Sequence, residues 1–192
     1  FENQIIPVSE SSGGTGSGLV NGGQTIHQGI EASYKLNILN MLRSKSKSKI
    51  FFQNNLSFIK AFYNKDRFIN SGSEQINIKD NYTPYAPKYF HTASLNYELP
   101  MGLGFVANAS FTGEQFGDEL NSIEPSNDGR EGMIEAFKVF DANVYYKIKK
   151  INAQLTGSVK NLTNERYIAS RRPQGIRVGL PRIAVVTFEM TF

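Results

Sequence analysis

The last ten residues of the chain, 183–192, form the pattern that most constrains the fold. Every second residue is apolar: Ala184, Val186, Phe188, Met190 and Phe192. Polar residues stand between them at Thr187, Glu189 and Thr191. Because side chains of an extended strand point to its two faces in turn, this pattern predicts a strand with one fully apolar face. A chain end normally frays into water, so a terminal Phe on that face indicates contact with lipid. An amphipathic edge strand of a soluble sandwich is the alternative.

The same alternation recurs along the whole chain and predicts about eight antiparallel strands. The other predicted strands are residues 1–8, 25–38, 50–68, 89–99, 103–112, 140–148 and 151–160. The segment 25–38 alternates most clearly. It is too long for a typical sandwich strand, and it fits a tilted transmembrane strand that projects beyond the bilayer.

The connections between these strands differ in length in a regular way. Residues 69–88, 117–135 and 161–182 form long connections, whereas the links near residues 40–49, 100–102 and 149–150 are shorter. In an antiparallel sheet this order places all long connections at one end. Outer-membrane barrels have short periplasmic turns and longer extracellular loops, and a soluble sandwich has no reason to separate them. The sequence therefore predicts an all-β fold, an antiparallel transmembrane β-barrel.

Composition excludes several other classes of protein. No segment reaches the roughly 20 apolar residues that a membrane-spanning helix needs. The chain has no cysteine, which excludes disulfides and thiolate metal sites. We find no nucleophile–base pair, metal-ligand cluster or cofactor fingerprint, so we expect no enzyme, no cofactor and no resident metal. The basic turn at 40–49 lacks interleaved aromatic residues, so we interpret it as a solvated turn and expect no nucleic-acid partner.

Several motifs together resemble one family, the TonB-dependent outer-membrane receptors. Residues 159–167, Val-Lys-Asn-Leu-Thr-Asn-Glu-Arg-Tyr, resemble its Asn-Leu-Phe/Thr-Asn-x-x-Tyr element. Residues 179–182, Gly-Leu-Pro-Arg, precede the terminal strand and resemble its Gly-x-Pro-Arg closing signature. Residues 85–89 resemble its Ala-Pro stretch, with the His displaced to His91. Residues 3–7 and 27–31 are similar to the branch that includes ferric-citrate and siderophore receptors.

The resemblance implies a bacterial outer-membrane receptor with a 22-stranded barrel and a plug domain, which imports a ferric chelate with energy from the TonB complex. We expect residues 1–192 to supply the C-terminal portion of the barrel, with the plug and the TonB box outside this chain. Two unpaired sheet edges are costly in lipid, so we expect the missing strands and the plug to be necessary for a stable, functional protein. Further implied partners are outer-membrane lipid, lipopolysaccharide and the barrel assembly machinery. The alternatives are a self-contained eight-stranded barrel with a structural or adhesion role and a soluble binding sandwich.

Two sets of residues are candidates for function within this resemblance. The closing signature and assembly signal comprises Asn161, Pro181, Arg182, Phe188 and Phe192. The candidate ligand contacts are Arg166, Arg171, Arg172 and Arg177, all in the last long connection. Guanidinium groups offer paired donors to carboxylates, which suits an anionic ferric chelate. The arginines could instead bind lipopolysaccharide phosphates or loop carboxylates such as Asp118 and Glu119. Replacing Arg171 and Arg172 with alanine is expected to weaken uptake without lowering barrel abundance.

Overall fold

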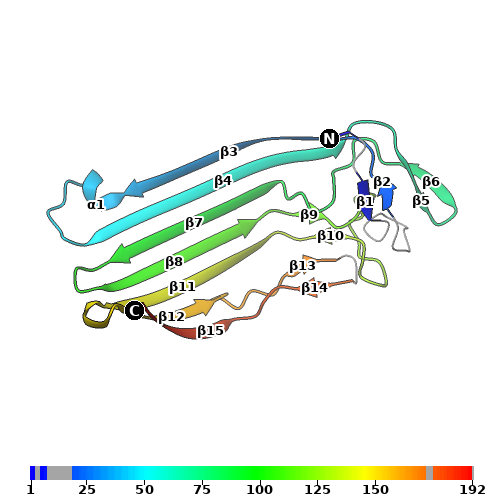
Figure 1. Ribbon diagram of the computed structural model, residues 1–192. Coiled ribbons are helices and arrows are strands. Elements are labelled where there is room, and N and C mark those ends of the chain that lie inside the picture. Colours follow the sequence, from blue (N-terminus) through cyan, green and yellow to red (C-terminus); the bar gives the residue numbers. More distant parts are fainter. Residues whose placement is uncertain (3–4, 8–18, 172–174, 192) are drawn as a thin grey trace.

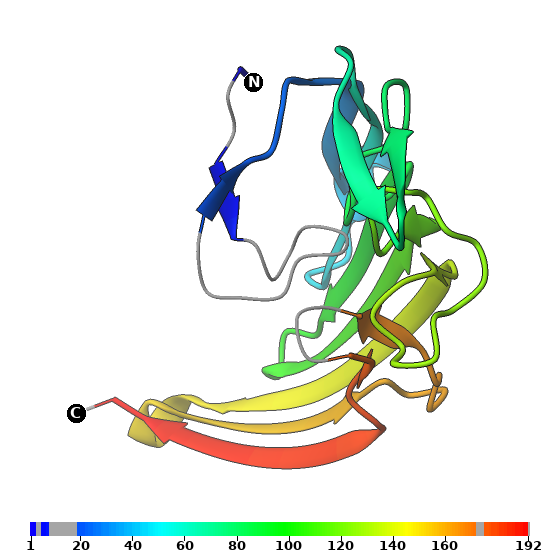
Figure 2. The ribbon, with the colours of Figure 1, turned by 90° about the vertical axis from the view of Figure 1, so that its right-hand side faces the viewer.

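A single curved antiparallel sheet of seven strands dominates the molecule (Figures 1 and 2). The computed structural model describes residues 1–2, 5–7, 19–171 and 175–191. In spatial order β15-β12-β11-β8-β7-β4-β3, each strand pairs with its neighbours along the chain. The bounds in chain order are β3 (Thr25–Asn37), β4 (Lys49–Tyr63), β7 (Tyr89–Glu98), β8 (Leu103–Thr112), β11 (Phe137–Ile148), β12 (Ala153–Lys160) and β15 (Ile183–Met190).

Short elements lie at the two ends of this sheet (Figure 1). Four two-stranded ribbons pair β1 (Ile5–Pro7) with β2 (Leu19–Asn21), β5 (Phe68–Ser71) with β6 (Glu74–Asn77), β9 (Gln115–Phe116) with β10 (Met133–Ile134), and β13 (Ile168–Ser170) with β14 (Arg177–Val178). Two short helices, α1 (Ile38–Met41) and the 3-10 helix η2 (Lys149–Ile151), lie at the opposite end. Neither helix in the described part of the chain is long and apolar enough to cross a membrane.

The connections confirm the predicted separation by length. We call one end of the sheet the loop end, where residues 64–88, 113–136 and 161–182 join the strands. The other is the turn end, where residues 38–48, 99–102 and 149–152 join them. Figure 1 shows the ribbons at the loop end and α1 at the turn end. This matches the asymmetry between extracellular loops and periplasmic turns in outer-membrane barrels.

Strand register places the predicted apolar positions on one continuous face. Directly paired residues of an antiparallel sheet share a face. Val144 is opposite Phe105 on β8 and Gly157 on β12, and Gly157 is opposite Val186 on β15. The pairing continues in the same phase across the other strands to β3. Apolar residues on this face are widely exposed, including Ile30 at 74% and Val186 at 77%. We call it the lipid face.

The opposite face is polar and hydrogen-bonded between strands. Ser33 on β3 donates to Asn55 Oδ1 on β4 at 2.7 Å, and the Asn55 amide donates to Thr92 Oγ1 on β7 at 3.0 Å. Polar residues on the lipid face also find partners, since the Asn54 amide nitrogen lies 2.6 Å from Nε2 of His91. Polar side chains of the sheet therefore hydrogen-bond to side chains of neighbouring strands, while the apolar side chains of the lipid face point away from the sheet.

The structure corrects four predicted boundaries. The strand predicted to begin at Phe140 begins three residues earlier, because pairing with β8 starts at Phe137 opposite Thr112. The predicted strand 1–8 does not extend the main sheet as a strand. Phe1 exchanges two backbone hydrogen bonds with Thr25 at the start of β3, but Ile5–Pro7, β1, pairs with β2 instead.

The strand predicted to end at Phe68 ends at Tyr63, whose ring packs with Ile69 and Ile78 in a small buried cluster, so the chain folds back there. The strand predicted to begin at Ile151 begins two residues later, since η2 and a left-handed Asn152 make the turn.

The predicted long loops also contain more structure than expected. The β5–β6 hairpin lies within residues 69–88, and β9 and β10 flank residues 117–132. Alternation does not reveal these ribbons, because β5 and β6 carry polar residues on both faces, and β9 and β10 are only two residues long.

A glycine on the polar face makes room for an aromatic ring near the turn end. Gly104 is opposite Tyr145, and a Cβ at Gly104 would lie 2.1 Å from Cζ of that ring. The Tyr145 hydroxyl donates to Glu98 Oε2 at 3.1 Å, and Lys147 Nζ donates to the same oxygen at 2.7 Å. The ring therefore reaches Glu98 only because position 104 has no side chain.

We expect Gly104→Val to destabilise the full-length protein by about 2 kcal/mol, because overpacking must displace the Tyr145 ring. The measurement is the urea midpoint of the protein folded in lipid vesicles. Gly157→Val is the matched control, since a Cβ there meets no atom within 4 Å. Equal midpoints for the two variants would contradict the packing explanation.

Candidate functional site

The three long connections at the loop end are bonded to one another. The Tyr85 N–H in 64–88 donates to the Phe116 carbonyl at 3.0 Å. The Arg171 N–H in 161–182 lies 3.3 Å from the Tyr85 hydroxyl oxygen, and its Nη1 donates to the Gly129 carbonyl at 3.1 Å. These contacts join segments that are distant in sequence into one layer above the strands.

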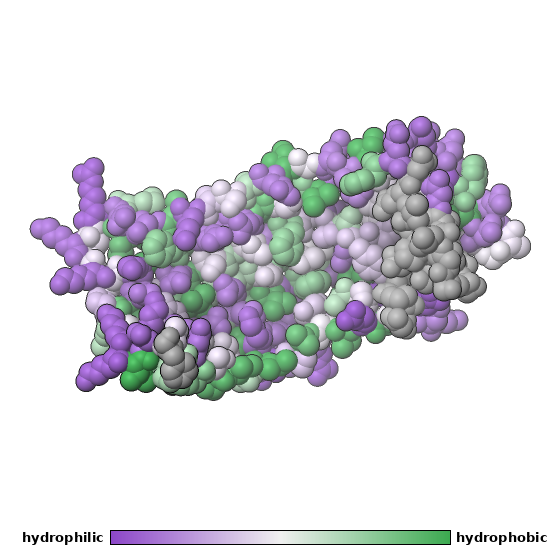
Figure 3. Space-filling model, in the orientation of Figure 1, coloured by the Kyte–Doolittle hydropathy of each residue, from purple (hydrophilic) through white to green (hydrophobic). Residues whose placement is uncertain are grey.

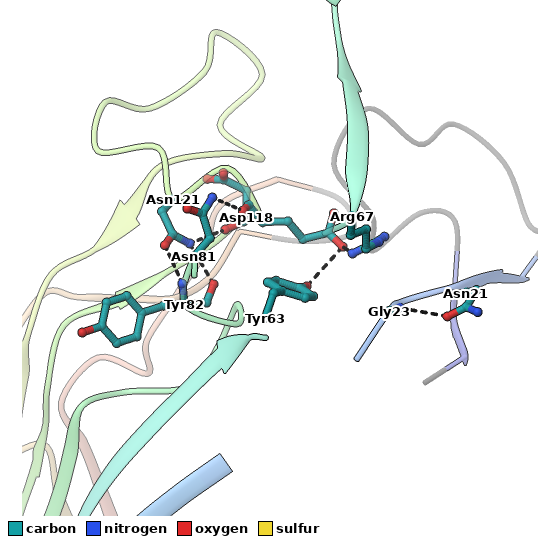
Figure 4. A network of polar contacts seen from close by, with 9 residues as sticks. Asn21, Gly23, Tyr63, Arg67, Asn81, Tyr82, Asp118 and Asn121 are labelled. Carbon is teal, nitrogen blue, oxygen red and sulfur yellow. Dashed lines mark hydrogen bonds and ion pairs between the residues drawn. The ribbon is translucent and has the colours of Figure 1, made fainter. Parts of the chain in front are cut away.

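A buried ion pair links the first two connections (Figure 4). Nη1 of Arg67 lies 2.6 Å from Oε1 of Glu119, a residue that is only 1% exposed. The Tyr63 hydroxyl donates to the same carboxylate oxygen at 3.4 Å, and the Asn81 amide donates to the Glu119 carbonyl at 2.9 Å. A buried carboxylate is tolerated only with such partners, so this pair fixes how residues 64–88 meet residues 113–136.

Two further polar residues hold residues 113–136 in place, Asp118 within this connection and Asn121 against residues 64–88. Asp118 is fully buried, and its carboxylate accepts from the Gly132 N–H at 2.9 Å and from the Ser122 hydroxyl at 3.1 Å. The Asn121 side chain exchanges two hydrogen bonds with the backbone of Tyr82, at 2.7 and 2.8 Å (Figure 4). Asp118 and Glu119, considered above as partners of the last-loop arginines, thus have structural roles within the first two connections.

Charged groups on the outside of this layer are also paired. The Lys88 ammonium donates to the Glu114 carboxylate, and this hydrogen bond raises the pKa of Lys88. The Ser126 hydroxyl donates to Asp128 at 2.7 Å and lowers the pKa of that carboxyl, with help from the Arg130 N–H. Both residues therefore keep their charges firmly at neutral pH.

A cavity of about 550 Å³ opens between the second and third connections. Its lining mixes apolar side chains with three glutamates and two arginines. The main lining residues are Ile123, Glu124, Met133, Glu135, Phe137, Glu165, Arg166, Tyr167, Ile168 and Arg171. The rings of Phe137 and Tyr167 stack with centroids 4.1 Å apart and form a firm wall. This cavity is a candidate ligand site at the loop end, because it brings charged and aromatic side chains of two connections together.

The structure places three of the four predicted arginines, in different surroundings. Arg166 is exposed and lines the cavity, and Arg177 is exposed on β14. Arg171 also lines the cavity, but it is only 5% exposed, and its Nη1 and Nη2 donate to the carbonyls of Gly129 and Met133. Arg171 therefore holds one loop against the other. Arg172 lies outside the described residues.

The closing signature forms the base of the last loop. Asn161 is buried and adopts a left-handed φ of 49°, a conformation that asparagine accepts better than most residues. Its amide nitrogen donates to the carbonyls of Glu165 and Leu180, both at 2.9 Å, and its Oδ1 accepts from the Glu165 N–H at 2.8 Å. Asn161 thus ties the beginning of the loop to its end.

The other signature residues continue this arrangement into the terminal strand. The Arg182 N–H donates to Asn164 Oδ1 at 3.0 Å, directly after Pro181. Phe188 lies on the lipid face and is 58% exposed. Phe192 lies outside the described residues. Gly179 completes the motif, because a Cβ there would lie 2.1 Å from the Tyr167 ring.

Comparison with known proteins decides the family. The family model described as TonB dependent receptor-like, beta-barrel matches residues 1–162. The chain belongs to this family. It is a family of transport receptors rather than of enzymes, and its members are bacterial outer-membrane proteins, so the receptor's seven strands are part of an outer-membrane barrel wall.

Solved structures of iron-chelate receptors share this fold. The ferric citrate transporter FecA, unliganded, is 23% identical and superposes with a TM-score of 0.70 over 93% of this chain and 25% of its own. The siderophore receptor PiuA from Acinetobacter baumannii is 17% identical, with a TM-score of 0.67 over 88% of this chain and 22% of its own. The ferric yersiniabactin uptake receptor FyuA from Yersinia pestis is 16% identical, with a TM-score of 0.65 over 91% of this chain and 25% of its own.

The receptor chain therefore spans about a quarter of the length of these relatives. In the described residues, the outer edges of β3 and β15 have no neighbouring strand, as a section of a larger barrel requires. No second large sheet packs on the first within this part of the chain, which disfavours the sandwich alternative. The described residues likewise contain no cluster of three or more metal-ligating side chains.

Proposed function

We propose that the complete receptor imports a ferric chelate, a siderophore or ferric citrate, across the outer membrane with energy from TonB. Family membership supports a transport role. The similar solved structures are named as a ferric citrate transporter and as siderophore receptors, which supports the substrate class. The alternative, a barrel with a structural or adhesion role, has no specific observation in its favour.

The loop-end cavity is the observation that carries this proposal. Arg166 offers a guanidinium to the cavity, and Tyr167 offers an aromatic wall beside it. Glu124, Glu135 and Glu165 line the same space. Such a mixed lining suits a ligand that presents carboxylates to Arg166 and hydroxyl or N–H donors to the glutamates. A polar metal chelate carries both kinds of group. Arg177 remains a second candidate contact on the same connection.

Replacing Arg166 with alanine in the complete receptor should weaken chelate binding by about tenfold, since a charge-assisted hydrogen bond contributes about 1.5–3 kcal/mol. The measurement is the dissociation constant of purified receptor for ferric citrate and for a ferric hydroxamate. The change should appear with whichever chelate the wild-type receptor binds.

Lys79→Ala provides the matched control. Lys79 is also a loop-end cation, but its ion pair with Asp66 is long, at 3.9 Å, and well exposed. This variant should bind and import like the wild type. Equal weakening in both variants would point to a general charge effect and argue against a site at Arg166.

Energy coupling is tested separately, in iron-limited cells with and without TonB. Import of the labelled chelate should stop without TonB, while binding at the cell surface should persist. Import that continues at the wild-type rate would remove energised transport from the proposal and leave the binding site intact.

A further inference from the structure

The turn end carries five exposed cations that the transport function does not use. We call them the basic rim: Arg43, Lys45, Lys47, Lys149 and Lys150. The first three follow α1, and the last two lie in η2. Figure 1 places both helices at the same end of the sheet, and Figure 3 shows long hydrophilic side chains extending from that end. The rim thus follows the barrel margin from one turn to another.

No acidic residue balances these cations. The turn segments 38–48, 99–102 and 149–152 contain neither Asp nor Glu. Two carboxylates lie beside these turns. Glu98 is engaged by Lys147 at 2.7 Å and by Lys49 at 4.0 Å, and Glu189 lines a pocket together with Lys149. Among the described residues, no ion pair involves any of the five rim side chains. The turn end therefore presents an excess of positive charge in two of its turns.

Apolar side chains stand exposed beside the basic rim. Met41 and Leu42 directly precede Arg43 and are 67% and 72% exposed. Met101 in the neighbouring turn is 66% exposed, and Ile151 beside Lys150 is 49% exposed. Water solvates the cations well, but exposing these four apolar side chains to water is unfavourable. The boundary between headgroups and acyl chains accommodates both, with cations at the phosphates and apolar groups below them.

We propose that the basic rim and its four apolar neighbours bind anionic phospholipid headgroups in the leaflet at the turn end. Charge complementarity selects this occupant, because two clusters of unpaired cations on one margin attract anionic over zwitterionic headgroups. The exposed apolar residues explain why the contact is with a membrane surface rather than with a soluble anion. The lipid face leads directly into this margin, so the phospholipids next to the barrel wall are within reach.

The test uses the complete receptor in phosphatidylcholine vesicles that contain spin-labelled phosphatidylglycerol or spin-labelled phosphatidylcholine. Electron spin resonance separates lipids at the protein surface from bulk lipids. We expect the wild type to prefer phosphatidylglycerol by about threefold, and high salt to reduce this preference. Replacing all five rim residues with glutamine should bring the preference close to one. If that variant does not fold, Lys149→Gln with Lys150→Gln should give a partial loss.

A control variant distinguishes the two ends of the barrel. Lys60, Lys65 and Lys79 are exposed cations toward the loop end, and their replacement by glutamine should leave the preference unchanged. A rim variant that keeps the full preference would overturn the proposal. So would a loop-end variant that loses as much, because the anionic lipid would then be bound at the opposite leaflet.

Discussion

Asn161→Ala should destabilise the receptor by about 3–4 kcal/mol, the larger of the two greatest effects we expect. The change removes three side-chain hydrogen bonds and leaves backbone groups of Glu165 and Leu180 without these partners, and each such loss costs about 1 kcal/mol or more. Alanine also tolerates the left-handed backbone poorly, at about 1 kcal/mol. The measurement is the denaturant midpoint of the complete receptor, with the heat-induced gel shift as a check that the barrel folds.

Two companion variants divide this effect between its causes. Asn161→Gly loses the same bonds but accepts the left-handed backbone, so it should be less destabilising than Asn161→Ala by about 1 kcal/mol. Thr163→Ala, at an exposed position of the same loop, should stay within about 0.5 kcal/mol of the wild type. An Asn161→Ala receptor as stable as Thr163→Ala would show that the loop base is not tied by this side chain.

Arg67→Ala should release the first two connections from each other. Glu119 would stay buried after losing its cation, a change that costs about 3 kcal/mol or more. We expect the barrel to persist. Amide hydrogen exchange in residues 113–136 should accelerate by about a hundredfold, because the free energy of local opening falls by about 3 kcal/mol. Mass spectrometry of the complete receptor in detergent measures this exchange peptide by peptide.

The exposed Lys79–Asp66 pair again supplies the control, since such pairs contribute about 0–1 kcal/mol. Lys79→Ala should leave exchange in residues 113–136 unchanged. The double variant Arg67→Met with Glu119→Leu removes both charges and should recover part of the protection. If the double variant exchanges as fast as Arg67→Ala, the buried charge is not the cause.

The barrel wall was largely predictable because a membrane imposes a simple pattern on it. Every second residue must be apolar where one face meets lipid, so Val144, Phe105 and Val186 could be assigned to one face before their pairing was known. The errors arose where this constraint ends. Residues 1–8 contain enough apolar residues to predict a short strand, but sequence alone could not show that Ile5–Pro7 pairs with Leu19–Asn21 instead of extending the wall.

The loop-end site was only partly predictable for a related reason. Arg166 and Arg171 look alike in sequence and both line the cavity, yet Arg166 is exposed, whereas Arg171 is buried against the carbonyls of residues 129 and 133. That difference depends on how distant loops meet. The Arg67–Glu119 pair went unrecognised because 52 residues separate its members and neither belongs to a motif. Asn161 was recognised as a signature residue, but its role in tying the loop needed coordinates.

The order of the strands has a consequence for how the wall is made. In the seven-stranded sheet each strand pairs only with its predecessor and its successor among the sheet strands. Such pairing is strictly sequential, so no strand has to wait for a strand beyond the next one before it pairs. The wall can therefore grow by addition of one hairpin at a time onto an existing edge. During this growth the newest strand is always the exposed template for the strand that follows it.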